Sequence, residues 1–112
     1  MIEQTEAPVG VEINSPVLPL FSRVEEFAKM GLIPPGSQRN RKYREEKVAF
    51  TDGVPEWTQW RLFDSQTSGG LMLAVAEEKM EKTLQRLHEK GIDRATVIGK
   101  VVKEPAGKIL VT

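Results

Sequence analysis

A short polar segment that ends in two glycines is the part of this sequence best suited to chemistry. It is "DSQTSGG", Asp64 to Gly70, and an apolar run, "LMLAV", follows it. Every side chain before the glycines forms hydrogen bonds, and Asp, Ser and Thr favour turns by bonding to nearby backbone groups. The glycines permit positive φ and close backbone approach, so that successive amide N–H groups can form an anion-binding nest.

Two interpretations of this segment stay open on physical grounds: a structural turn, and a loop that contacts an anionic substrate group. The hydroxyls of Thr67 and Ser68 would add donors in the second case. The spacing differs from that of a Walker loop, no lysine follows the glycines, and the strand expected next supplies no helix dipole. The residues predicted to lie near a substrate or phosphate are Asp64, Gln66, Thr67, Ser68, Gly69 and Gly70.

A basic segment earlier in the chain is the second candidate for contacts at a site. "LIPPGSQRNRKYREEK" begins with two prolines and a glycine, which disfavour regular structure, and five basic residues then fall between Arg39 and Lys47. One interpretation is a solvated loop, because such charges are usually exposed. The other is a loop that presents Arg39 and Asn40 toward a cleft or a partner.

The composition excludes several other classes of function. The 112 residues contain equal numbers of basic and acidic side chains, 16 of each, so no footprint for nucleic acid is indicated. The chain has no cysteine, which rules out a thiolate zinc site and a disulfide framework. No apolar run is long enough to span a membrane, and the first residues do not resemble a signal peptide, so a cytoplasmic protein is expected. The one histidine, His88, is expected to have a structural or solvent-exposed role near a helix end.

The elements that must position these loops follow from the periodicity of apolar residues. Residues 9–13 alternate as a half-buried strand, and a helix is predicted from Leu18 to Met30. Ser22 and Glu25 would form its capping box, and Gly31 its left-handed C-cap.

The second half of the chain is predicted to continue the same sheet. A short helix is expected after Pro55, with Trp57 and Trp60 as core or interface anchors. Further predicted elements are a central buried strand at 71–76, a helix at 77–90, and strands at 95–102 and 107–112 that pair through the turn "EPAG". This order predicts a single domain over residues 1–112, of the α+β class, with a mixed β-sheet and helices packed on one side.

The glycine segment and its neighbours resemble one known family. "LFDSQTSGGLMLAV" is similar to the Asp-Pro-Gln-Thr-Ser-Gly-Gly-Leu-Leu signature of selenophosphate synthetases (selenide, water dikinases). "VEEFAKMGLIPPGSQRNR" resembles the preceding block of that family, and "INSPVLPLF" and "GIDRATVIGKVV" fit in order and spacing. Ser65 departs from the signature, which has proline there, and this loosens the loop because proline would fix φ.

The resemblance implies an AIR-synthase-like fold and an ATP-dependent activity. Members of the family make selenophosphate from selenide, ATP and water, release AMP and phosphate, and use Mg²⁺. The resemblance implies that an N-terminal ATP-binding domain supplies the nucleophile and the metal ligands and forms a homodimer.

This chain resembles only the later part of the C-terminal domain. We therefore expect a truncated piece of a longer protein, with no catalytic residue and no metal ligand of its own. It should be inactive alone, should bind neither Mg²⁺ nor ATP alone, and should self-associate through apolar surface left exposed.

Two alternatives stay open. Another ATP-dependent synthetase of the AIR-synthase-like superfamily would share the fold with a different substrate. A stand-alone binding or regulatory module would account for the short chain and its lack of catalytic residue types.

Overall fold

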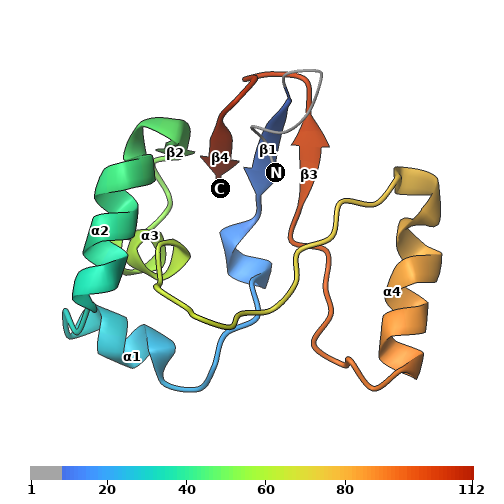
Figure 1. Ribbon diagram of the computed structural model, residues 1–112, viewed down its shortest axis with the longest axis horizontal. Helices are drawn as coiled ribbons and strands as arrows, with labels where there is room; N and C mark the ends of the chain where they lie inside the picture. Colours follow the sequence, from blue (N-terminus) through green and yellow to red (C-terminus); the bar gives the residue numbers. More distant parts are fainter. Residues whose placement is uncertain (1–8) are drawn as a thin grey trace.

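The protein is described by a computed structural model that covers residues 9–112. Four short strands form one mixed sheet in the order β2-β4-β1-β3 (Figure 1). Strand β1 runs antiparallel to β3 and parallel to β4, and β4 runs parallel to β2. The α+β class and the mixed sheet are confirmed. The strands are β1 (Gly10–Ile13), β2 (Val48–Phe50), β3 (Gly99–Val102) and β4 (Ile109–Val111).

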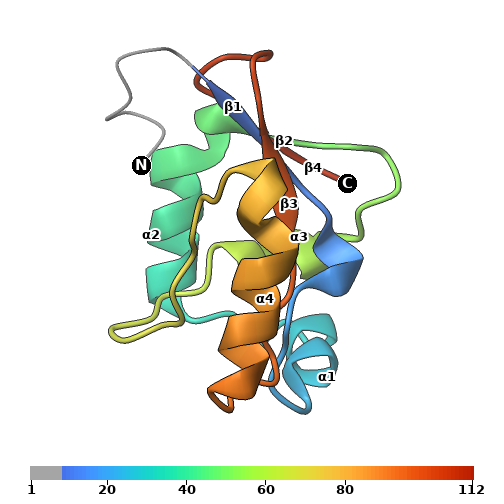
Figure 2. The same cartoon turned by 90° about the vertical axis from the view of Figure 1, so that its right-hand side faces the viewer.

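The helices fall into two groups. Helices α1, α2 and α3 lie together beside the β2 end of the sheet, whereas α4 stands apart beyond β3 (Figures 1 and 2). The helices are α1 (Val24–Lys29), α2 (Pro35–Arg44), α3 (Glu56–Leu62) and α4 (Met80–Glu89), with 3-10 turns at Ser15–Val17, Glu45–Lys47 and Glu77–Lys79.

The core lies where β4 and β2 meet α3. The buried hydrophobic side chains of the described part of the chain are Val54, Phe63 and Val111. Phe63, the residue after α3, packs edge-to-face against Phe50 of β2 with ring centroids 6.2 Å apart. Because Phe63 directly precedes the glycine segment, the start of that segment is fixed to the sheet.

The first predicted helix is shorter than its periodicity indicates. Arg23 has a φ of +66°, which interrupts any helix that starts at Leu18, and α1 begins only at Val24. The capping box of Ser22 and Glu25 is wrong, because no side chain caps this helix and Glu25 bonds to Lys29 instead. The left-handed C-cap is confirmed, with Gly31 at a φ of +76°.

The predicted basic loop is wrong, because most of it forms helix α2. Pro35 occupies its first turn, where a missing N–H costs nothing and the fixed φ suits a helix. The helix was missed because its exposed residues are polar and carry no apolar stripe.

Two predictions about the sheet are also wrong. Residues 71–76 form no strand and are exposed, so the predicted central strand is absent. Strands β3 and β4 do not pair with each other, since β1 lies between them. The helix at 77–90 is confirmed as a 3-10 turn followed by α4, and His88 has the structural position expected, with Nε2 2.9 Å from the carbonyl oxygen of Ala95.

Candidate functional site

The first turn of α2 holds the root of the glycine segment. Ser37 is 1% exposed, and its Oγ donates a hydrogen bond to Asp64 Oδ1 at 3.2 Å. The same Oγ accepts a hydrogen bond from the backbone N–H of Ser65 at 3.3 Å. The carboxylate of Asp64 thus lies beside the N-terminal turn of α2, where the helix dipole stabilises negative charge. One buried hydroxyl therefore links two segments that are 27 residues apart.

Ser65, the position that departs from the family signature, has a specific role at this root. Proline has no backbone N–H and would be unable to bond to Ser37 as Ser65 does. A Cβ on Gly36 would lie 2.5 Å from the Ser65 Oγ, so the close approach of α2 requires glycine there. In this chain a hydrogen bond holds the loop at the position where proline would stiffen it.

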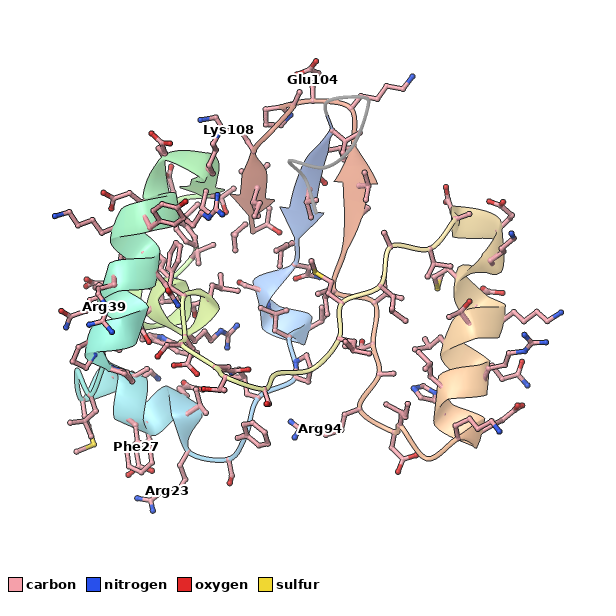
Figure 3. The ribbon with its side chains drawn as sticks, in the orientation of Figure 1. Arg23, Phe27, Arg39, Arg94, Glu104 and Lys108 are labelled. Atoms are coloured by element: carbon pink, nitrogen blue, oxygen red, sulfur yellow. The ribbon has the colours of Figure 1, made fainter. Side chains whose placement is uncertain are left out.

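Asn40 and Arg39 lie one turn further along α2. Asn40 donates from Nδ2 to the carbonyl oxygen of Phe63 at 3.1 Å, which fixes the end of α3 just before the loop. Arg39 projects from α2 (Figure 3). Its Nη2 lies 3.9 Å from the place that a Gly36 Cβ would occupy, and the Ser65 Oγ lies 2.5 Å from the same place, so the guanidinium borders the loop root. It forms no hydrogen bond or ion pair with any residue of the described chain.

The tip of the segment is free, in contrast to its root. Gln66 Nε2 donates to Asp64 Oδ2 at 3.2 Å, and Gly69 lies near the Gln66 side chain. Thr67 and Ser68 are exposed and make no side-chain hydrogen bond within residues 9–112. Neither Gly69 nor Gly70 has positive φ, so the expected left-handed backbone is not present at these glycines. The hydroxyls of Thr67 and Ser68 and the backbone N–H groups of the tip therefore form no hydrogen bond within residues 9–112.

A second set of polar contacts stiffens the α2–α3 pair that carries the loop. Arg41 stacks over Trp60 at 4.3 Å and donates from Nη2 to Gln59 Oε1 at 3.1 Å. Gln59 in turn donates to the carbonyl oxygen of Val54 at 3.2 Å. Sequence reasoning missed Ser37, Gly36 and these partners. The signal that could have found them was Pro35 followed by small residues, which is typical of a helix start.

Two surface hollows lie beside Trp57, away from the glycine segment. Their volumes are about 360 and 380 Å³, and no residue of 64–70 lines either one. The larger hollow includes Arg61, whose Nη2 donates to the carbonyl oxygen of Ser15, whereas its Nε is buried without a partner. Burial lowers the pKa of the Arg61 guanidinium, and the nearby Glu25 carboxylate partly offsets this.

The described residues hold no group of three or more His, Cys, Asp or Glu side chains placed to share a metal ion. Asp64 is the only carboxylate of the glycine segment, and two hydrogen bonds already engage it. Over the same part of the chain, no helix combines the length and apolar character that a membrane span needs.

The mixed sheet and the anchored glycine segment belong to a domain for which a family model exists. The family model of the AIR synthase related protein C-terminal domain matches residues 5–112, and the chain belongs to this family.

Curated relatives narrow the comparison. The chain is 42% identical over 102 residues to a selenide, water dikinase of Pelobacter propionicus, covering 91% of this chain and 29% of the relative. It is 37% identical over 103 residues to selenide, water dikinase 2 of Peptoclostridium acidaminophilum, covering 92% and 29%. A selenide, water dikinase of Caldanaerobacter subterraneus is 41% identical over 93 residues, covering 83% and 27%. The chain thus spans less than a third of the length of these relatives, as one domain of a larger protein would. The resemblance to selenophosphate synthetases is confirmed.

Proposed function

We propose that this chain acts as the C-terminal domain of a selenide, water dikinase and presents residues 64–70 to the anionic groups of the reaction. In that reaction selenide, ATP and water give selenophosphate, AMP and phosphate. The supporting observation is the contrast within the loop, with a root fixed by Ser37 and Asn40 and a tip whose donors are unused. The relatives named selenide, water dikinase support the choice of reaction.

The role proposed for the loop is to bind and orient phosphate oxygens. The hydroxyls of Thr67 and Ser68 and the backbone N–H groups beside them can donate to an oxyanion. Arg39 borders the root of the loop without an ion-pair partner in residues 9–112, so it can add positive charge. These groups supply binding and orientation, and none of them acts as a nucleophile.

ATP and Mg²⁺ are proposed to be held mainly by the N-terminal part of the longer protein, which is also proposed to form the homodimer. When bound, Mg²⁺ would neutralise charge on the transferred phosphoryl groups. The described residues of this chain lack the carboxylate cluster that such an ion requires. We therefore propose that this chain alone has no dikinase activity.

The experiment measures selenide-dependent AMP formation by the full-length parent protein. Thr67→Ala should lower kcat/KM by about tenfold, which corresponds to loss of about 1.4 kcal/mol of transition-state binding. Ser22→Ala is the matched control, because Ser22 lies in an exposed turn before α1. A parent without selenide-dependent AMP formation would refute the proposal. A Thr67→Ala variant with unchanged kcat/KM would remove the role given to its hydroxyl.

A second candidate is an ATP-dependent synthetase of the same superfamily with another substrate. The family match favours keeping it, because the matched model describes AIR synthase related proteins in general. Supplying the parent with ATP and other nucleophiles in place of selenide discriminates the two candidates.

A further inference from the structure

The carboxylate of Asp64 connects the buried root of the glycine segment with its exposed tip. Its Oδ1 accepts a hydrogen bond from Ser37 Oγ at 3.2 Å, and its Oδ2 accepts one from Gln66 Nε2 at 3.2 Å. The carboxylate therefore couples a side chain of the tip to a buried side chain of α2. Because its own negative charge would repel an anion, orienting the loop is the role that suits Asp64.

The contacts continue from Gln66 into the tip itself. The Gln66 Oε1 lies 2.8 Å from the place that a Cβ on Gly69 would occupy, so the amide side chain lies directly against the backbone at Gly69. Thr67 and Ser68 lie in the chain between these two contacting positions. The place of their hydroxyl and N–H donors therefore depends on where Gln66 is held, and the carboxylate described above holds it.

We propose that Ser37 is a positioning residue of this loop, which acts through Asp64 to hold the donors of Thr67 and Ser68 in the arrangement that binds phosphate oxygens. The inference rests on the function proposed above for the glycine segment. Ser37 is 1% exposed, too buried to contact a substrate, so its effect passes through the hydrogen bonds that it forms. A loop that is ordered before binding loses less conformational entropy on binding, which raises its affinity for the ligand.

Ser65 shows how this chain orders the loop without the proline of the family signature. Its backbone N–H donates to Ser37 Oγ at 3.3 Å. Proline would lack this N–H and would instead fix φ at the same residue. A hydrogen bond from α2 and a proline ring within the loop thus restrict the same part of the backbone. It follows that proline at this position should compensate for loss of the Ser37 hydroxyl, a coupling that a hydroxyl with only a packing role would not produce.

The first test measures selenide-dependent AMP formation by the full-length parent protein at varied ATP concentration. Ser37→Ala should raise KM for ATP about tenfold and change kcat by less than about twofold, because the donors remain but must be ordered on binding. Adding Ser65→Pro should return KM to within about twofold of the value for the unsubstituted parent. Thr67→Ala removes a donor itself, so adding Ser65→Pro to that variant should restore nothing.

Limited proteolysis of the same parent proteins gives a readout that needs no activity. Cuts between Gln66 and Gly70 by a protease of broad specificity, mapped by mass spectrometry, should form about tenfold faster in Ser37→Ala, and adding Ser65→Pro should reverse this. Gln66→Ala breaks the same set of contacts from the exposed side and should also speed these cuts, which keeps the test valid if Ser37→Ala folds poorly.

Thr58→Ala is the matched control for loss of stability alone. Thr58 is 3% exposed on α3, and it lines a hollow that no residue of 64–70 borders. Equal KM and equal cleavage for Ser37→Ala and Thr58→Ala would overturn the proposal, and so would a Ser37→Ala variant that Ser65→Pro does not restore. A parent without selenide-dependent AMP formation would refute the proposed function alone, because faster cleavage of Ser37→Ala, reversed by Ser65→Pro, would still show that Ser37 orders the tip.

Discussion

Replacing Ser37 by alanine tests the link between α2 and the glycine segment most directly. The substitution removes the hydroxyl that donates to Asp64 and accepts from the Ser65 N–H, and Ser37 is 1% exposed. The Ser65 N–H then has no partner on the protein, and because Asp64 and Ser65 are exposed, water can replace part of what is lost.

The magnitude follows from the two bonds. A bond to a carboxylate contributes about 1.5–3 kcal/mol and a neutral one about 0.5–1.5 kcal/mol. Both bonds are long and Asp64 is exposed, so the low end of each range applies and the loss is about 2 kcal/mol. Alanine is a better helix former than serine by about 0.5 kcal/mol, which leaves a net destabilisation of about 1.5 kcal/mol.

The assay is urea unfolding followed by the fluorescence of Trp57 and Trp60, which are half-buried on α3 close to the loop root. The unfolding free energy should fall by about 1.5 kcal/mol with an unchanged dependence on urea, and hydrogen exchange of the Ser65 amide should become faster. The control is Ser68→Ala at the exposed tip, for which a change within about 0.5 kcal/mol is expected. If Ser37→Ala and Ser68→Ala have equal stability and equal exchange at Ser65, the anchoring argument is refuted.

Three further substitutions probe the backbone and the buried guanidinium, each by the midpoint of thermal unfolding. Gly36→Ala should destabilise the fold by about 1–2 kcal/mol, because the added Cβ clashes with the Ser65 Oγ. Combining it with Ser65→Gly should restore most of the lost stability. A double variant as unstable as Gly36→Ala alone would contradict the clash. Gly31→Ala should lower the free energy of unfolding by about 1 kcal/mol, because the φ of Gly31 is +76°. Gly70→Ala is the control, since a Cβ there has equal free space and φ is not positive, and it should leave the free energy of unfolding unchanged. Equal losses for the two variants would contradict the assignment of strain to Gly31. Arg61→Met removes the Nη2 bond to the Ser15 carbonyl oxygen together with a buried Nε that has no partner. Because the lost bond and the relieved burial offset each other, the change should stay within about 1 kcal/mol, and a loss of about 3 kcal/mol would contradict this balance.

Helix α2 shows why sequence reasoning failed at the loop root. Two prolines and a glycine disfavour a helix, and the basic residues that follow predict a loop, either solvated or presented toward a cleft. The helix depends on polar contacts of Ser37, Asn40 and Arg41 with α3 and the segment after it, and such contacts leave no apolar period in the sequence. These hydrogen bonds can be recognised only once the position of α3 relative to α2 is known.

Residues 71–76 show the opposite failure. Their apolar side chains correctly indicate a segment suited to burial, and the sequence therefore predicted a central strand. A strand needs a neighbour for its backbone hydrogen bonds, and residues 9–112 offer none at this place. Local composition sets the preference for burial, whereas the availability of a partner is a property of the assembled chain.

The sequence by itself determined the family, the α+β class, the position of the glycine segment, and elements whose signal is local: β1, α3, α4 and the C-cap at Gly31. Periodicity and turn chemistry decide these features within a few residues. The tertiary structure alone decided the sheet order, in which β1 separates β3 from β4, and the fixation of Asp64 and Ser65 by Ser37. Both depend on contacts between residues far apart in the chain, and the free energy of such contacts exists only once the backbone has brought the partners together.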